Sequence, residues 1–254
     1  MLGVETYRAL RPQAAGRAVP MATSSAAAMP LQADRLFPEV GRRLSAARPV
    51  MRPALKRLFD IAGALGLVAV LLPLLLVVAA LVKADGGPAL FAHERVGRGG
   101  RRFGCLKFRS MVVDSAERLE AILAADPEAR AEWEATRKLK RDPRVTAVGR
   151  FLRASSLDEL PQLLNVLRGE MSLVGPRPVQ AAELATHYGP AAAMLYASVR
   201  PGITGLWQVS GRSDTSYDTR VALDLRYVAN PTLLGDLRIL LKTPMAVLGR
   251  RGAY

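Results

Sequence analysis

The sequence has very few side chains that bind metal ions through sulfur or imidazole nitrogen. It contains one cysteine, Cys105, and two histidines, His93 and His187. A single cysteine excludes an internal disulfide and a cysteine-cluster metal site, and two histidines do not supply a histidine-rich zinc site. Any bound metal is therefore expected to use carboxylate and phosphate oxygens, a preference typical of Mg²⁺ or Mn²⁺.

Acidic residues are also scarce, because 22 Asp and Glu face 36 Lys and Arg, which gives a formal net charge of +14. Such an excess of positive charge indicates anionic partners: nucleic acid, anionic lipid headgroups or phosphorylated substrates. The chain shows no aromatic-basic recognition motif and carries a long apolar run. These two features argue against a nucleic-acid-binding protein, and no nucleic acid is expected among the partners.

The first 30 residues lack an apolar segment that would form the core of a signal peptide. Residues 1–52 are rich in Ala, Pro, Arg and Ser, as in "RPQAAGRAVPMATSSAAAMP". This composition predicts a disordered, basic N-terminal tail.

Charge is missing altogether from Ile61 to Val82, a run of 22 residues. At 1.5 Å per residue the run makes about 33 Å of helix, enough to cross a bilayer core of about 30 Å. Pro73 lies near its middle, and proline bends a helix by removing a backbone hydrogen bond. The flanks 1–57 and 83–109 are both positive, so both favour the cytoplasm. Two topologies remain open, a spanning helix and a re-entrant helix broken at Pro73.

The re-entrant form, over residues 53–84, would place both positive flanks on one side. The preceding "KRLFD" supplies Lys56, Arg57 and Asp60, which we expect to anchor the entry at the headgroup layer. Residues 85–254 are then expected to form one domain on the cytoplasmic face.

This domain is predicted to be α+β and mainly helical, with amphipathic surface helices and a small β element. A hairpin leading into a strand is expected over 86–111, and a short strand within "RPGITGLWQVSGR". Helices are expected over 113–140, 148–153, 159–168, 179–198 with a break at Gly189-Pro190, 216–228 and the basic C-terminal segment from residue 233.

An acidic pair, Asp158-Glu159, stands out within the basic stretch "RASSLDELPQLLNVLRGEMSLVGPRP". A helix starting at the pair would place both carboxylates at its positive end and lower their pKa values. A structural interpretation is open, because Ser156 and Glu159 match the capping box Ser-x-x-Glu. Paired acid–base catalysis is disfavoured, since adjacent side chains diverge by about 100° on a helix.

Basic residues around the pair suggest a phosphate site. Arg177 lies between Pro176 and Pro178, which restrict the backbone and present the guanidinium rigidly for bidentate phosphate binding. Each of the basic candidates taken alone has the interpretation of a solvated surface charge. The further candidates are Lys107, Arg109, Arg153 and Arg212.

Several blocks together resemble the bacterial sugar transferases, and among them the monotopic polyprenyl-phosphate phosphoglycosyl transferases. They are "KRLFDIAGALGLVAVLLPLLL", "KFRSM", "RASSLDELPQLLNVLRGEMSLVGPRP", "RPGITGLWQVSGR" and "LDLRYVANPTLLGDLRILLKT". The resemblance covers about residues 54–254 in the family's order. The family's helix-breaking Ser-Pro appears here as Leu72-Pro73, so the proline is kept and the serine is absent. The resemblance therefore implies the re-entrant form, a helix over residues 53–84 that is broken at Pro73.

The resemblance implies transfer of a sugar-1-phosphate from a UDP-sugar to undecaprenyl phosphate, with release of UMP. It implies that Asp158 attacks the β-phosphate to form a covalent phosphosugar intermediate and that Glu159 binds Mg²⁺. It also implies that Arg153 and Arg177 bind phosphate, and that Arg212 lies toward the nucleotide. The C-terminal segment "LDLRYVAN" resembles that of family members that act on hexoses, so the sugar is expected to be glucose or galactose.

The implied location is the cytoplasmic face of the bacterial inner membrane, among its lipids. There the chain would catalyse the first membrane step of exopolysaccharide or glycoconjugate synthesis, with downstream glycosyltransferases as possible partners. The alternative is a non-catalytic membrane scaffold of a polysaccharide assembly complex, whose function would survive loss of the Asp158 carboxylate.

Overall fold

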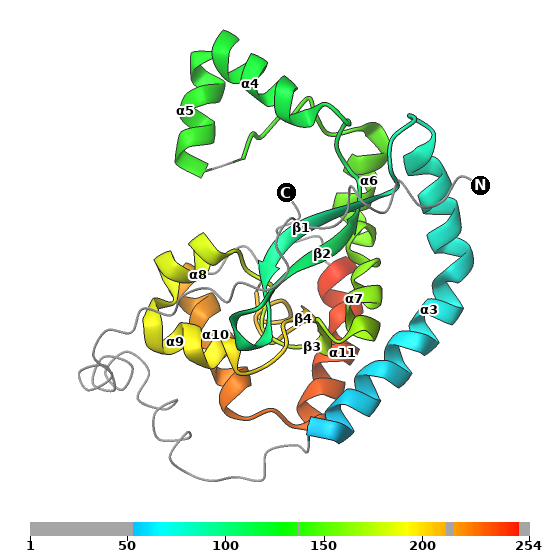
Figure 1. Cartoon of the computed structure of the whole chain (residues 1–254), viewed down its shortest axis with the longest axis vertical. Coiled ribbons are helices and arrows are strands. Elements are labelled where there is room, and N and C mark those ends of the chain that lie inside the picture. Colours follow the sequence, from blue (N-terminus) through cyan, green and yellow to red (C-terminus); the bar gives the residue numbers. More distant parts are fainter. Residues whose placement is uncertain (1–52, 137, 212–215, 249–254) are drawn as a thin grey trace.

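The structure is a computed structural model that describes residues 53–136, 138–211 and 216–248 (Figure 1). The predicted N-terminal tail, 1–52, lies outside the described residues. In chain order the elements are α3 (Pro53–Lys83), β1 (Leu90–Val96), η1 (Arg98–Gly100), β2 (Arg102–Phe108), α4 (Ser115–Ala125), α5 (Pro127–Thr136), α6 (Ala147–Ser155), η2 (Leu157–Glu159), α7 (Gln162–Arg168), β3 (Ser172–Val174), α8 (Ala181–His187), α9 (Gly189–Ala197), β4 (Gly202–Thr204), α10 (Tyr217–Ala229) and α11 (Leu233–Leu248). The predicted class, mainly helical with a small β component, is confirmed over this part of the chain.

Two small sheets lie in the body of the molecule. Strands β1 and β2 form the predicted antiparallel hairpin, with Leu90 opposite Phe108. Strands β3 and β4 pair in parallel although they are separated along the chain by α8 and α9. A β-carbon on Gly202 would lie 2.1 Å from the backbone nitrogen of Gly175, so only glycine permits this close approach of two backbones.

The single helix predicted over 113–140 is wrong, because the chain turns there and forms α4 and α5. The carboxylate of Asp126 accepts hydrogen bonds from the backbone N–H groups of Glu128, at 2.9 Å, and Ala129, at 3.1 Å. Pro127 begins α5, where its missing N–H costs little. Neither helix buries a residue, and Figure 1 shows the pair projecting from the body.

Helix α6 places the predicted amphipathic segment 148–153 against the hairpin. Its first turn is capped by the Thr146 side chain, which accepts a hydrogen bond from the Gly149 N–H at 2.9 Å. A β-carbon on Gly149 would lie 2.0 Å from the carbonyl oxygen of Ser110, so the helix reaches the backbone after β2 only through a glycine. Because of this contact, Arg153, on α6, lies near the end of β2.

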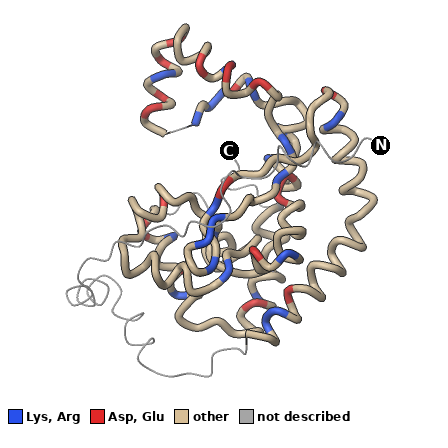
Figure 2. Tube along the Cα trace, viewed as in Figure 1, with Lys and Arg blue, Asp and Glu red and all other residues tan. Residues whose placement is uncertain are grey.

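Helix α3 has 31 residues and continues through Pro73, so the predicted break of the helix at this proline is not present. Among the described residues it is the one helix long and apolar enough to cross a membrane, judged by length and composition. Its middle is exposed, and Val70 shows 78% of its surface. Figure 1 shows α3 running along one side of the molecule, and Figure 2 shows it free of charge between its two ends.

Both ends of α3 pack on the same body. Near the N-terminal end, Ala64 belongs to a core cluster with Leu163 and Leu173. Near the C-terminal end, Val78 and Val82 pack with Phe108 and Leu152 in a second cluster. The remaining core lies under α8, α9 and α10, and its buried members are Val96, Val179, Leu184, Tyr188, Ala192, Tyr196, Val221 and Leu225.

Candidate active site

The acidic pair does not lie in the first turn of a long helix, as the sequence predicted. Asp158 and Glu159 form the 3₁₀ turn η2, and α7 begins only at Gln162. The capping-box interpretation is also wrong, because Ser156 adopts a left-handed conformation, with φ of 57°, and its side chain makes no capping hydrogen bond. Ser156 instead terminates α6. The tight turn therefore holds the pair between two helices.

The side chain of Asn165 fixes α7 against β2, and so brings the pair to the hairpin. Asn165 is fully buried, and its amide donates to the carbonyl of Gly104 at 2.8 Å. The amide oxygen accepts the backbone N–H of Leu106 at 2.9 Å. Two hydrogen bonds to one strand fix the register between the elements, since both ends of the amide are satisfied. The next residue of the strand, Lys107, then faces η2.

Lys107 forms ion pairs with both carboxylates. Its Nζ lies 2.7 Å from Oε1 of Glu159 and 3.4 Å from Oδ2 of Asp158. The side chain of Asp158 is only 11% exposed, whereas that of Glu159 is 31% exposed. The structure thus joins three predicted site residues from two segments about fifty positions apart. The more buried carboxylate is the one farther from the lysine.

The pKa of Asp158 is raised, not lowered as the helix-start argument predicted. Burial is the largest cause, because it disfavours the charged carboxylate, and the neighbouring Glu159 adds to it. The Lys107 charge and, more weakly, Arg153 oppose the shift. Burial also lowers the pKa of Lys107, but the two carboxylates outweigh it and the net shift is upward. The prediction failed because burial outweighs the nearby positive charges that favour the ionised carboxylate.

A pocket opens beside the Lys107 cluster. It is lined by Arg95, Cys105, Lys107, Glu159, Gln162, Arg177, Pro178, Ile203 and Gln208. Three cations face one carboxylate in this lining, which favours an anionic ligand. The predicted residues Lys107, Glu159 and Arg177 therefore meet at one cavity, while Arg95, Gln162 and Gln208 were missed.

Arg177 is presented by a braced loop. Its carbonyl accepts the hydroxyl of Tyr196 at 3.1 Å, and the buried Asp224 carboxylate lies near enough to interact with its charge. Its guanidinium lies 5.6 Å from the ring centre of Trp207, within cation–π range. Asp224 is itself held by the Tyr188 hydroxyl at 2.8 Å. The rigid presentation expected from the flanking prolines is therefore reinforced by the hydrogen bond to the Arg177 carbonyl and by the contact of its guanidinium with Trp207.

The other basic candidates differ in their positions. Arg153 donates to the Ser110 hydroxyl at 2.9 Å and lies close enough to influence the charge state of Asp158. Arg109 turns away from the pair, toward the end of α3, where it forms an ion pair with Asp85 and donates to the Val82 carbonyl at 2.8 Å. Arg212 lies outside the described residues.

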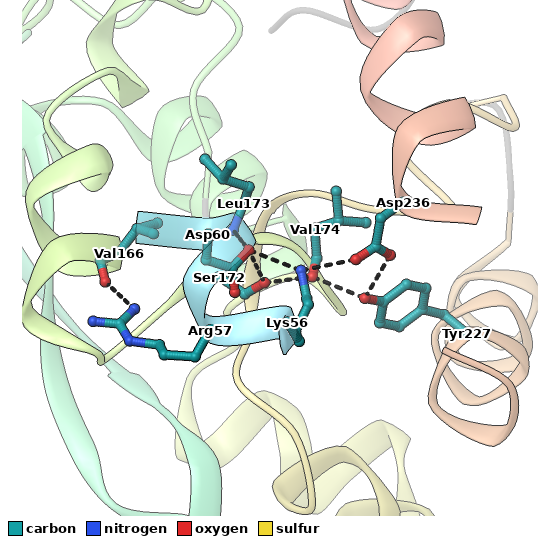
Figure 3. Close-up of polar contacts among 9 residues, drawn as sticks. All are labelled: Lys56, Arg57, Asp60, Val166, Ser172, Leu173, Val174, Tyr227 and Asp236. Carbon is teal, nitrogen blue, oxygen red and sulfur yellow. Dashed lines mark hydrogen bonds and ion pairs between the residues drawn. The ribbon is translucent and has the colours of Figure 1, made fainter. Parts of the chain in front are cut away.

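The residues expected at the headgroup layer contact the protein body (Figure 3). The Nζ of Lys56 lies 2.8 Å from both Asp60 Oδ1 and Asp236 Oδ2. Asp60 is 1% exposed, and its carboxylate also accepts the Ser172 hydroxyl at 3.0 Å and the Leu173 N–H at 3.1 Å. These contacts hold the first turns of α3 to β3 and α11.

Arg57 contacts the end of α7 in the same way. It donates to the carbonyls of Val166, at 2.6 Å, and Leu167, at 2.9 Å. Carbonyls in the last turn of a helix lack partners within the helix, and a cation satisfies them well. Arg57 therefore stabilises the junction of α3 with the C-terminal end of α7.

The acidic pair is compatible with a magnesium ion. Among the described residues no three His, Cys, Asp or Glu side chains come together, so an all-protein metal cage is absent from this part of the chain. Mg²⁺ is commonly held by one or two carboxylates together with substrate phosphates. Glu159, which is the more exposed carboxylate and lines the pocket, suits that arrangement.

Comparisons with known proteins agree with the geometry. The family model described as "Bacterial sugar transferase" matches residues 51–250. The chain is 58% identical over 200 residues, 79% of its length, to the "UDP-galactose-lipid carrier transferase" of Erwinia amylovora, of which the match covers 42%. It is 52% identical over 210 residues to "Exopolysaccharide production protein ExoY" of Rhizobium meliloti, covering 82% of this chain and 92% of that protein.

A third relative is "UDP-glucose:undecaprenyl-phosphate glucose-1-phosphate transferase" of Caulobacter vibrioides. The identity is 42% over 209 residues, which cover 78% of this chain and 72% of that protein. The chain spans less than half the length of the Erwinia relative and nearly the full length of the Rhizobium one. The family match includes α3, the acidic pair and every described residue that lines the pocket. The chain therefore belongs to the bacterial sugar transferase family.

Proposed function

We propose that this protein transfers a hexose-1-phosphate from UDP-galactose or UDP-glucose to undecaprenyl phosphate and releases UMP. The observation that carries the proposal is the buried Asp158 carboxylate beside Glu159 and Lys107, at a cationic pocket, on a body attached to an apolar helix. The names of the relatives support the donor, the lipid acceptor and a place in exopolysaccharide production.

In the first step an Asp158 Oδ attacks the β-phosphorus of the UDP-sugar. The bond from this phosphorus to the bridging oxygen breaks, and UMP leaves with the bonding electron pair. A phosphosugar remains on the carboxylate. Burial suits Asp158 to this role. Water does not stabilise the negative charge of a buried carboxylate, and the carboxylate is therefore a more reactive nucleophile.

In the second step a phosphate oxygen of undecaprenyl phosphate attacks the same phosphorus. The bond to Asp158 breaks, the carboxylate is regenerated, and the product is undecaprenyl diphosphate carrying the sugar. Lys107 favours the ionised form of Asp158 before the first step and after the second, because its positive charge opposes the effect of burial. A Mg²⁺ held by Glu159 would neutralise charge on the phosphates.

The acceptor is a lipid, so the position of α3 bears on the mechanism. At 1.5 Å per residue its 31 residues extend about 46 Å, yet both ends bind the same body, through Lys56 at one end and through Arg109 at the other. A spanning helix would separate its ends by the bilayer. This attachment supports a re-entrant helix that dips into one leaflet with its exposed middle and keeps the site at the headgroup plane, on the cytoplasmic face.

The proposal is tested with UDP-glucose, UDP-galactose and UDP-N-acetylhexosamines, each labelled at the β-phosphate. In nanodiscs without acceptor, one hexose donor should leave label on the protein, and undecaprenyl phosphate should remove it with release of UMP. A membrane scaffold would acquire no label from any donor. UMP release without transfer of the label to lipid would point to a hydrolase.

A further inference from the structure

Two arginines of the pocket have no acidic partner. Within the described ranges, neither Arg95, on β1, nor Arg177 forms an ion pair with a carboxylate. The one hydrogen bond of the Arg95 guanidinium reaches the neighbouring carbonyl of Glu94, at 3.2 Å. Lys107, in contrast, is neutralised by its two carboxylates. The positive charge that remains in the pocket therefore comes from the arginines.

The two guanidinium groups repel each other. The pKa of Arg95 is lowered, chiefly by burial and also by the charge of Arg177. Glu183 lies near enough to oppose the shift, but its carboxylate already accepts the Tyr217 hydroxyl and the Gln180 N–H. Two like charges in one partly buried pocket cost free energy unless an anion lies between them. An anionic ligand would remove this cost.

The spacing of the arginines is fixed by buried hydrogen bonds. The Tyr196 hydroxyl, on a side chain 1% exposed, lies 3.1 Å from the carbonyl of Val96 and 3.1 Å from that of Arg177. The backbone N–H of Val96 also donates to the carbonyl of Val179 at 2.9 Å. Val96 directly follows Arg95. The strand that carries one arginine is thus bonded to the loop that carries the other.

We propose that Arg95 acts with Arg177 as a clamp for the phosphate that stays on UMP. The inference rests on the proposed function, in which the β-phosphate reacts beside Lys107 and Asp158. The other phosphate of the UDP-sugar, which leaves with UMP, then needs a site of its own nearby. A guanidinium group binds two phosphate oxygens at once through two N–H groups. Two arginines that are already held in place can do so without a change in the protein. As the bond to the β-phosphorus breaks, the UMP phosphate gains one negative charge. Arg95 is then a catalytic residue, because it stabilises the leaving group.

Arg95→Gln tests the clamp through binding of UMP alone. A charge-assisted hydrogen bond to phosphate is lost, so the dissociation constant of UMP should rise roughly 10- to 100-fold. Uridine, which has no phosphate, should bind the variant and the wild type equally. The matched control is Arg101→Gln, which removes the same charge from an exposed site in the same hairpin and should leave UMP binding unchanged. UMP affinity unaltered in Arg95→Gln would overturn the proposal.

A second variant provides the test if Arg95→Gln fails to fold. Arg95→Lys keeps the charge but loses the paired geometry, so it should bind UMP more weakly than wild type and more tightly than the glutamine variant. Wild-type affinity in the lysine variant would contradict a paired contact. Failure of the proposed function is recognised separately. If the wild type binds UMP through Arg95 and yet acquires no label from any UDP-sugar, that result would support the anion site and contradict the transferase function.

Discussion

The Nζ of Lys56, in the first turns of α3, lies 2.8 Å from Oδ2 of Asp236 on α11. Asp236 is completely buried and Asp60, the other partner of Lys56, is 1% exposed. The hydroxyl of Tyr227 also lies 3.0 Å from Asp236 (Figure 3). One lysine therefore compensates two buried carboxylates that belong to elements more than 170 positions apart.

Removal of that lysine should destabilise the protein strongly. Lys56→Met leaves two buried carboxylates facing each other, and loss of one partner of a buried ion pair costs about 3–5 kcal/mol of unfolding free energy. Denaturant unfolding in detergent measures the change. Arg118→Met, which breaks the exposed pair with Asp114, is the control and should have no measurable effect. Equal effects of the two variants would contradict the buried network.

Asp158→Asn should abolish both turnover and labelling by a β-phosphate-labelled UDP-hexose. The change keeps the shape of the side chain and removes its nucleophilic charge, and loss of a nucleophile lowers turnover by several orders of magnitude. Glu159→Gln should reduce both activities, and added Mg²⁺ should restore part of the loss. Thermal unfolding of both variants serves as the folding control. Label on Asp158→Asn protein would show that another residue is the nucleophile.

Lys107→Gln should move the acidic limb of the pH–rate profile to higher pH. Lys107 lowers the pKa of Asp158, so its removal raises that pKa further, and the nucleophile is ionised only at higher pH. The rate of protein labelling, followed between pH 5 and 9, measures the shift. Lys107→Arg retains the charge and should keep the wild-type limb. An unchanged limb in the glutamine variant would separate Lys107 from the ionisation of Asp158.

Asp224 should make the protein less stable as the pH rises from about 4 to about 7. Burial raises the pKa of this carboxyl from 3.8 to about 7, so within that range the folded state binds more protons than the unfolded state. The unfolding free energy then falls by up to about 1.4 kcal/mol per pH unit and levels off above the upper limit. Asp224→Asn should flatten this part of the pH–stability curve. Parallel curves for variant and wild type would reject the shift.

Both ends of α3 should face the cytoplasm. Single cysteines at Ala54 and Ala84, which are exposed positions just inside and just beyond the helix, are introduced in a Cys105→Ala background. In intact cells both should resist a membrane-impermeant thiol reagent, and both should react after the cells are opened. Reaction of one of them in intact cells would mean that α3 spans the membrane.

Local patterns predicted most of the elements, because turn residues and periodicity act within a few positions. The hairpin, the break before α9 and the short strand β4 follow from such signals. The division of α4 from α5 depends on Asp126-Pro127, a turn signal that is present in the sequence. The sequence also predicted Lys107 among the basic residues around Asp158 and Glu159, and the structure pairs it with both carboxylates.

Long-range contacts explain what the sequence left unpredicted. The raised pKa of Asp158 depends on burial beneath elements distant in the chain, and a local helix argument gives the opposite sign. Arg109 carries the same charge as Lys107 two positions earlier, yet Asp85 holds it at the end of α3. Arg95 carried no local signal, and only the folded hairpin brings it to the pocket.

The attachment of α3 at both ends has a consequence for the kind of bilayer that the protein tolerates. A helix that crosses a membrane must match the thickness of the hydrocarbon layer, and mismatch costs free energy for every ångström. In the proposed re-entrant topology, a helix whose two ends are held to one body, as Lys56 and Arg109 hold α3, does not reach the opposite surface of the membrane. Hydrophobic mismatch then costs α3 no free energy. The protein should therefore bind thin and thick membranes equally well.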